Sequence, residues 1–192
     1  MTASTAVVPG SEEYQANRQS MEDKLGEIRE AYESAFSGGG EKSLERLRSR
    51  DKMTPRERID SLLDQGSPFL ELCTMAGFGT DFAVGGSVVG GIGTVEGVDC
   101  LIVANDPTVK GGASNEWTLR KCNRLQEIAR KNRLPVLTLV ESGGADLRSQ
   151  KEVFVPGGAM FRDITQLSKE GIPTIAIVYG NCTAGGAYIP GM

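Results

Sequence analysis

The stretch PTIAIVYGNCTAGGAYIP, residues 173–190, joins a run of apolar residues to a segment of small residues that contains the pair Gly185 and Gly186. The apolar run is typical of a β-strand that is buried on both faces of a sheet. A glycine pair directly after such a strand indicates a close approach of the backbone to another group, because glycine has no side chain to block it. The stretch therefore predicts a buried strand followed by a candidate site.

The same order of apolar strand and glycine-rich loop occurs twice upstream. The two segments are DCLIVANDPTVKGGASN (residues 99–115) and PVLTLVESGGADLR (residues 135–148). Helical patterns over about residues 115–132 and 159–169 separate the three strands. Alternating strands and helices predict an α/β fold with parallel strands and right-handed crossovers, so the three loops should meet at one edge of the sheet.

Composition divides the chain into three parts. Residues 1–19 are polar, and we expect a disordered tail there. Residues 20–83 are expected to form a helical N-terminal segment, and residues 84–192 the α/β part. At the start of the α/β part, VVGGIGTV and DCLIVAND are expected to be neighbouring strands joined by the turn residues Glu96 and Gly97.

The helical segment contains two expected helices. The first is amphipathic and predicts packing on the domain surface or on a partner subunit. Its apolar positions are Met21, Leu25, Ile28, Tyr32 and Ala35. SGGGEKS, residues 37–43, is expected to end it as a flexible break. In the second helix Thr54 is the predicted cap, Pro55 fits the first helical position, and Glu57 completes a capping box.

Composition also excludes several classes of protein. The net charge is −4, whereas a nucleic-acid surface needs a basic excess. No apolar run approaches the roughly 20 residues that span a bilayer, and the N-terminus lacks the basic and apolar regions of a secretory signal. These features predict a cytoplasmic protein that does not bind nucleic acid or membranes.

The chemistry available to the side chains is limited. The sequence has no histidine, which removes the commonest general base and metal ligand. The four cysteines are scattered without a CxxC pair, so nothing supports a zinc or other metal site. Glycine, by contrast, accounts for 25 of 192 residues, and many of these occur as pairs between apolar runs. Catalysis, if present, should rely on backbone amides.

Backbone N–H groups that point to the same place can bind a phosphate or stabilise an oxyanion. No GxxxxGK[ST] is present, and GGIGTVEG lies between two adjacent strands, which disfavours nucleotide binding of the P-loop or Rossmann kind. The oxyanion hypothesis uses the N–H of Gly144 or Ala145 together with the N–H of Gly185 or Gly186. The alternative is that these glycines only permit close packing of helices and strands. Spacing alone leaves both open.

Five motifs in order resemble the carboxyltransferase (β) subunits of biotin-dependent acyl-CoA carboxylases. They are TPRERIDSLLDQGSPFLEL, NDPTVKGGASN, EIARKNRLPV, ESGGADLRSQ and GNCTAGGAYIPGM. TVKGG with CTAGGAY is closer to the methylcrotonyl-CoA type than to the propionyl-CoA type. The resemblance runs from about residue 20 to the last residue. It implies a crotonase-like (ClpP/crotonase) fold of repeated ββα units with a helical N-terminal extension.

The resemblance also implies a mechanism. Gly185 and Gly186 would donate their amides to the thioester oxygen of acyl-CoA, with Gly144 and Ala145 as further candidate donors at the same cavity. Carboxybiotin, carried by a biotin carboxylase and carrier (α) subunit, would deliver CO2, and biotin itself would remove the proton from the acyl group. The acyl-CoA enolate held by the amides would then attack CO2. The family assembles as a hexamer, so a homo-oligomer is expected.

Further residues are candidates for binding the CoA part of the substrate. They are Lys110, Gly111, Gly112 and Arg148. Lys110 is equally consistent with a solvated loop lysine, and Arg148 with a structural ion pair. Cys182 and Ser142 lack a base and are not expected to act as nucleophiles. Glu141 as a proton-transfer group is unnecessary if biotin is the base.

Family β subunits contain two related domains, and this sequence resembles the first part of the acyl-CoA domain. We therefore expect a fragment that is inactive alone. Two rival functions remain at this stage. One is a crotonase-like hydratase, isomerase or decarboxylase acting on acyl-CoA, which would not depend on biotin. The other is a non-catalytic assembly subunit, which would bind no acyl-CoA.

Overall fold

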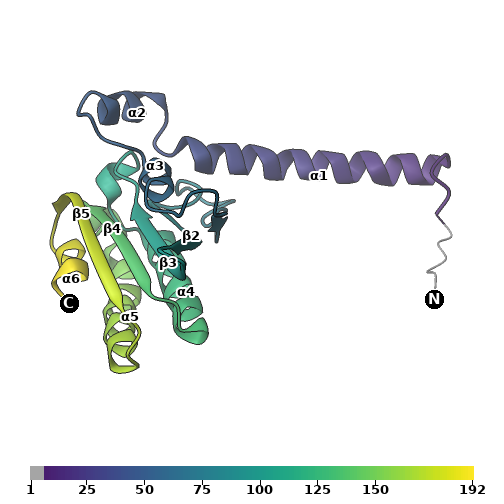
Figure 1. The fold of residues 1–192 in the computed structure, drawn as a ribbon. Helices are drawn as coiled ribbons and strands as arrows, with labels where there is room; N and C mark the ends of the chain where they lie inside the picture. The colour runs from purple at the N-terminus through teal and green to yellow at the C-terminus, as the bar shows by residue number, and fades with distance from the viewer. Residues whose placement is uncertain (1–6) are drawn as a thin grey trace.

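A computed structural model describes residues 7–192, which form a five-stranded sheet with helices on both faces (Figure 1). The strands follow one another in the order β1-β2-β3-β4-β5. They are β1 (Leu70–Glu71), β2 (Val88–Val95), β3 (Val98–Asn105), β4 (Val136–Ser142) and β5 (Thr174–Cys182). β3, β4 and β5 are parallel, whereas β1–β2 and β2–β3 are antiparallel. The predicted α/β fold and its parallel strands are confirmed.

The hairpin between β2 and β3 turns at the two expected residues. Glu96 has φ 49° and Gly97 has φ 74°, the positive values that a two-residue hairpin turn requires because they match the twist of the flanking strands. Asp64 holds this turn from outside, since its carboxylate accepts hydrogen bonds from the N–H groups of Glu96 and Gly97 at 2.7 and 2.8 Å. The neighbouring-strand prediction is therefore confirmed.

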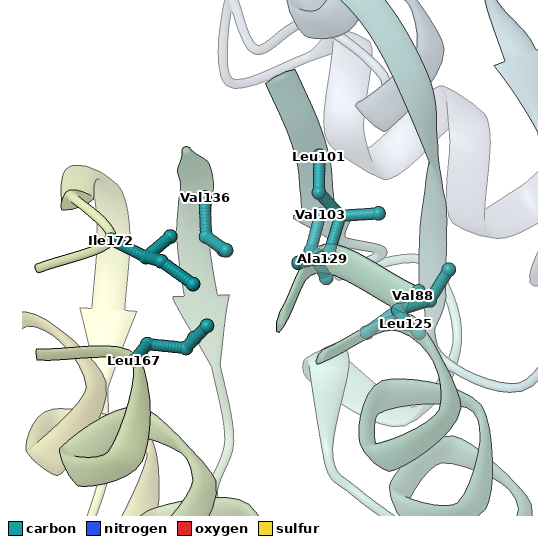
Figure 2. Packing of buried hydrophobic residues seen from close by; sticks show 8 residues of the cluster. All are labelled: Val88, Leu101, Val103, Leu125, Ala129, Val136, Leu167 and Ile172. Atoms are coloured by element: carbon teal, nitrogen blue, oxygen red, sulfur yellow. The ribbon is translucent and has the colours of Figure 1, made fainter. Parts of the chain in front are cut away.

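Both faces of the sheet are largely buried at β2, β3 and β4, as the continuous apolar runs predict. On one face α4 (Glu116–Asn132) and α5 (Gln150–Lys169) pack against the strands, and Figure 2 shows the core between them. This cluster consists of Val88, Leu101, Val103, Leu125, Ala129, Val136, Leu167 and Ile172. Side chains alternate along each strand, so every second strand residue faces the opposite side of the sheet. There they form a second cluster with Ile59 of α3 (Pro55–Asp60). The predicted burial of the strand that follows Pro173 is wrong, because β5 has no buried residue and lies at the edge of the sheet with only β4 beside it among residues 7–192.

The N-terminal segment enters the domain rather than only preceding it. β1 pairs with β2, and α3 contacts both β2 and β3. α3 has the predicted capping box between Thr54 and Glu57, with Pro55 at the start. Residues before Val84, where the α/β part was expected to begin, therefore contribute a strand and a helix to it. The two-residue β1 was missed because so short a strand has no periodicity.

α1 (Glu12–Ser37) extends away from the rest of the fold (Figure 1). It begins at Glu12 behind the cap Ser11, inside the expected tail, of which residues 1–6 lie outside the described residues. Only Ala31 and Ala35 are buried in α1. The exposed fractions of the other expected apolar residues are 62% for Met21, 40% for Leu25, 40% for Ile28 and 41% for Tyr32. These residues do not pack on the domain surface, which leaves the partner-subunit alternative.

The turn between α1 and α2 (Glu41–Arg48) is packed, although a flexible break was expected there. The N–H of Gly39 donates to Oγ1 of Thr108 at 2.9 Å. A Cβ on Gly39 would overlap the carbonyl oxygen of Thr108, and one on Gly38 would lie 2.7 Å from Oδ2 of Asp106. Glycine is needed here because the turn lies directly against the loop after β3. α2 is therefore held beside that loop.

α5 begins at Gln150, nine residues before the expected start at about residue 159. Pro156, Gly157 and Gly158 weaken the helical pattern in that part of the sequence. Packing outweighs them, because Val153 and Met160 are buried in a cluster with Leu119 of α4. None of the helices in residues 7–192 is long and apolar enough to cross a membrane.

We expect Leu125→Ala to destabilise the fold by about 2–5 kcal/mol, because it opens a cavity between α4 and the sheet. The Leu125 side chain is fully buried in the cluster of Figure 2. Urea unfolding followed by far-UV circular dichroism measures the change. Leu147→Ala is the control, since Leu147 is 69% exposed. Equal unfolding midpoints for the two variants would contradict this description of the core.

Candidate functional site

The three glycine-rich loops that follow β3, β4 and β5 touch one another at one edge of the sheet. The N–H of Gly143 donates to the carbonyl oxygen of Gly111 at 2.9 Å, and the N–H of Ser114 donates to the carbonyl oxygen of Gly144 at 2.7 Å. The loop after β5 joins them through the N–H of Thr183, which donates to the carbonyl oxygen of Ser142 at 3.0 Å. The structure therefore brings the predicted loops together.

Several of the candidate glycines lie where one loop approaches the next. A Cβ on Gly144 would lie 2.9 Å from the carbonyl oxygen of Thr183, and one on Gly186 would lie 2.7 Å from Oγ of Ser142. A Cβ on Gly112 would overlap the carbonyl oxygen of Glu141. These three glycines permit close packing of the loops, which is one of the two roles considered for the glycine pairs in the sequence. Gly185 differs, because a Cβ there would meet only the Phe161 ring at 3.4 Å.

The four candidate amide donors also differ in their hydrogen bonds. The N–H of Gly186 donates to the carbonyl oxygen of Thr183 at 2.9 Å, and the N–H of Gly144 donates to Oγ of Ser142 at 3.2 Å. Within residues 7–192 the N–H groups of Ala145 and Gly185 donate no hydrogen bond. One unused donor therefore lies in each of two loops that are in contact.

Glu141, at the carboxyl end of β4, connects the site to the N-terminal helices. Its carboxylate accepts a hydrogen bond from Nη2 of Arg58 at 2.6 Å and one from Nζ of Lys52. The Arg58 side chain is 1% exposed and the Glu141 side chain 10%. The guanidinium of Arg58 also lies over the Tyr179 ring of β5, 4.7 Å from its centroid. One carboxylate thus joins α3, β4 and β5.

The backbone of Glu141 is fixed as well, since its N–H donates to Oδ1 of Asn105 at 3.2 Å. Burial opposes ionisation of the Glu141 carboxyl, but the hydrogen bonds and charges of Lys52 and Arg58 outweigh it and hold its pKa below the usual range. Glu141 is therefore an anion at neutral pH and already has two cationic partners. It is poorly suited to act as a free general base.

The remaining polar side chains near the loops are mostly engaged. Oγ of Ser142 donates to the carbonyl oxygen of Gly112 at 3.2 Å while accepting from Gly144. Lys110 forms an ion pair with Asp146 at 2.8 Å, and Asp146 also accepts from the backbone N–H of Arg148. The Lys110 partner lowers the pKa of Asp146. Lys110 thus has an ion-pair partner while its side chain stays 52% exposed, so the CoA-binding and solvated-lysine alternatives both remain open.

The expected CoA-binding residues lie on two of these loops. Lys110, Gly111 and Gly112 form the short helical turn η1 (Lys110–Gly112) after β3. Arg148 belongs to η2 (Leu147–Ser149) after β4. Within residues 7–192 the exposed Arg148 guanidinium makes no ion pair. Structure thus gives no support to the alternative of a structural ion pair for Arg148.

Four residues of the site were not expected from the sequence. They are Lys52, Arg58, Asn105 and Tyr179. Arg58 lies in a helix whose sequence signature is purely structural, and the pair Arg58–Glu141 spans 83 positions. The sequence holds no local signal for the burial of Arg58, because arginine is mostly exposed and its partner is distant in the chain.

Comparison with known proteins places this geometry in a family. A model described as the carboxyl transferase domain matches residues 46–192. A probable biotin-dependent acyl-coenzyme A carboxylase beta2 subunit from Mycobacterium tuberculosis is 59% identical over 184 residues, 96% of this chain and 35% of the relative. The mitochondrial methylcrotonoyl-CoA carboxylase beta chain of Arabidopsis thaliana is 49% identical over 187 residues, 95% of this chain and 32% of the relative.

A solved structure agrees with these relatives. The beta subunit of geranyl-CoA carboxylase from P. aeruginosa superposes with a TM-score of 0.88 at 39% identity, and the match covers 98% of this chain and 36% of that one. The expected crotonase-like α/β fold is confirmed. The chain spans about a third of the length of the relatives it matches.

We expect Glu141→Gln to lower the free energy of unfolding at pH 7 by about 3–5 kcal/mol, because it leaves the buried Arg58 without its anionic partner. The wild-type advantage should persist above about pH 4.3, the ordinary glutamate pKa, and disappear as the pH falls through the lowered pKa of Glu141. Urea unfolding of both proteins from pH 7 to pH 3 measures the difference.

Glu127→Gln is the matched control, because Glu127 pairs with the exposed Lys131 and Arg124 on the surface of α4. It should change stability little. If Glu141→Gln behaved like the control at pH 7, the Arg58–Glu141 pair would not hold this edge of the sheet together.

Proposed function

We propose a function for this chain from one premise: it belongs to the carboxyl transferase domain family. The chain forms the acyl-CoA site of the carboxyltransferase component of a biotin-dependent acyl-CoA carboxylase of the methylcrotonyl-CoA type. The relatives named as acyl-CoA and methylcrotonoyl-CoA carboxylase beta chains support this substrate class. In those relatives the complete reaction would also use residues outside the third of their length that this chain matches.

The observation that carries the proposal is the pair of unused amides in two contacting loops. The N–H groups of Ala145 and Gly185 donate no hydrogen bond within residues 7–192, whereas those of the adjacent candidates Gly144 and Gly186 do. Gly185 is the first residue of helix α6 (Gly185–Gly191), and the N–H groups at the start of a helix have no partner within it. Two free amides in contacting loops are the arrangement expected of an oxyanion site. We assign Ala145 and Gly185 as the donors to the thioester oxygen, with Gly144 and Gly186 holding the loops in contact.

Such donors act where negative charge develops. Removing a proton next to a thioester carbonyl places charge on the carbonyl oxygen as the enolate forms. Each preorganised amide donor typically contributes about 2.7–4 kcal/mol of transition-state stabilisation. Because these donors are part of the backbone, they need no histidine and keep their position through the contacts between the loops.

The described residues offer no free side-chain base beside these amides. Glu141 is paired with Lys52 and Arg58, and Asp146 with Lys110. Cys182 has only a weak contact from its Sγ to the carbonyl oxygen of Gly180 at 3.7 Å. The site therefore fits a reaction whose base comes from outside this chain. Carboxybiotin, held by a partner subunit, supplies both the CO2 and that base.

The relatives are named as carboxylase beta subunits, which weighs against a crotonase-like hydratase, isomerase or decarboxylase. A homo-oligomeric assembly is supported by transcarboxylase 12S, a solved structure described as a hexamer assembly, which matches this chain at 32% identity with a TM-score of 0.79. The hexamer and the cytoplasmic location remain predictions.

An amide-to-ester exchange at Gly185 tests the donor directly. Replacing Gly185 by glycolic acid removes one N–H and adds no side chain. The exchange is practical because residues 182–192 begin with Cys182 and can be joined as a synthetic peptide to a recombinant remainder. We expect binding of a short-chain acyl-CoA thioester to weaken roughly two- to tenfold, the effect of losing one hydrogen bond of about 0.5–1.5 kcal/mol.

Two controls make the result specific. The ligated protein with all amides intact should bind like the recombinant chain. An S-alkyl-CoA thioether, which has no carbonyl oxygen, should bind both ligated proteins equally in the same calorimetric titration. Equal weakening of thioester and thioether would remove the oxyanion assignment. Failure of the unmodified chain to bind any acyl-CoA would favour the non-catalytic assembly subunit.

A further inference from the structure

Helix α1 has an apolar stripe that the fold leaves uncovered. The stripe consists of Met21, Leu25, Ile28 and Tyr32, whose spacings alternate between four and three residues. Two helices that pack side by side in a coiled coil have this spacing of apolar residues. All four residues are at least 40% exposed, and α1 extends away from the domain (Figure 1). The stripe therefore has the form of a surface that packs on another helix.

A projecting helix of this kind needs a partner for its stability. In water an isolated helix is marginal, and most helical stability in proteins comes from the packing of an amphipathic face. α1 has 26 residues, but only Ala31 and Ala35 are buried. The domain thus anchors α1 near one end, where Ala35 packs on Gly85. We propose that the apolar stripe packs on the same stripe of a second copy of this chain, with the two α1 helices antiparallel.

The charges beside the stripe favour an antiparallel pair of identical helices. Glu22 follows Met21 and Arg29 follows Ile28, so both charges lie along the same edge of the stripe. In the antiparallel pair Leu25 packs on the partner's Ile28. This register brings Glu22 beside the partner's Arg29. Because the pair is symmetric, the two-fold axis repeats the contact, and opposite charges meet twice.

A parallel pair would instead place like charges together. Arg18 lies in line with the stripe, three residues before Met21, and would face the partner's Arg18. Lys24, on the other edge of the stripe, would face the partner's Arg29. The charges that the antiparallel pair uses are available. Arg29 is exposed and makes no ion pair within residues 7–192, and the pair of Glu22 with Arg18 is exposed, so it contributes little.

Sedimentation equilibrium of the chain tests the pairing by charge reversal. Arg29→Glu makes both contacts of Glu22 with the partner repulsive, and Glu22→Arg does the same to the contacts of Arg29. We expect each variant to weaken self-association about tenfold or more. An equimolar mixture of the two variants should regain the wild-type association, because each chain then supplies the charge that the other needs. Glu30→Arg is the matched control, since Glu30 is exposed on the opposite side of α1, and it should leave association unchanged.

Three results would overturn the proposal. Stronger association of Arg29→Glu would indicate a parallel pair, in which the reversed charge faces the partner's Lys24. Variants that associate like Glu30→Arg, or whose mixture does not recover, would show that these charges do not meet. A wild type that stays monomeric at about 1 mM would leave the stripe to a different protein. Circular dichroism checks that every variant keeps its helix content. None of these results depends on acyl-CoA, so the proposed function is tested separately.

Discussion

The carboxylate of Glu141 is the constraint on which the rest of the site depends. It accepts from Arg58 and Lys52 and lies at the end of β4, directly before the SGGAD loop. A Cβ on Gly180 would lie 2.5 Å from Oε1 of Glu141, so β5 reaches its loop by passing against this carboxylate. Removing the charge would therefore disturb the glycine loops after β4 and β5 together.

Under the proposed function, this arrangement would let a chain without histidine hold the charge of an enolate. The contacts between the loops use side chains and some of the amides for structure, and leave the N–H groups of Ala145 and Gly185 unused within the described residues. The carboxylates near them, Glu141 and Asp146, are paired with cations. In the proposed site, the amides that are already hydrogen-bonded hold the loops together. Only the free amides can donate to a bound carbonyl oxygen as negative charge develops on it.

Much of the fold could be predicted from the sequence, because buried parallel strands and their loops leave strong local patterns. The long strands, the hairpin turn at Glu96 and Gly97, and the meeting of the three loops all followed from such patterns. The pair Arg58–Glu141 and the packing of Gly39 on Thr108 could not be predicted, since each joins distant parts of the chain.

The most direct test of the central claim is the backbone amide spectrum of the 15N-labelled chain during titration with an acyl-CoA thioester. We expect the amide signals of Ala145 and Gly185 to shift strongly, and to shift far less with the thioether analogue that lacks the carbonyl oxygen. Unmoved signals at both positions, while other residues respond to the bound thioester, would contradict that claim.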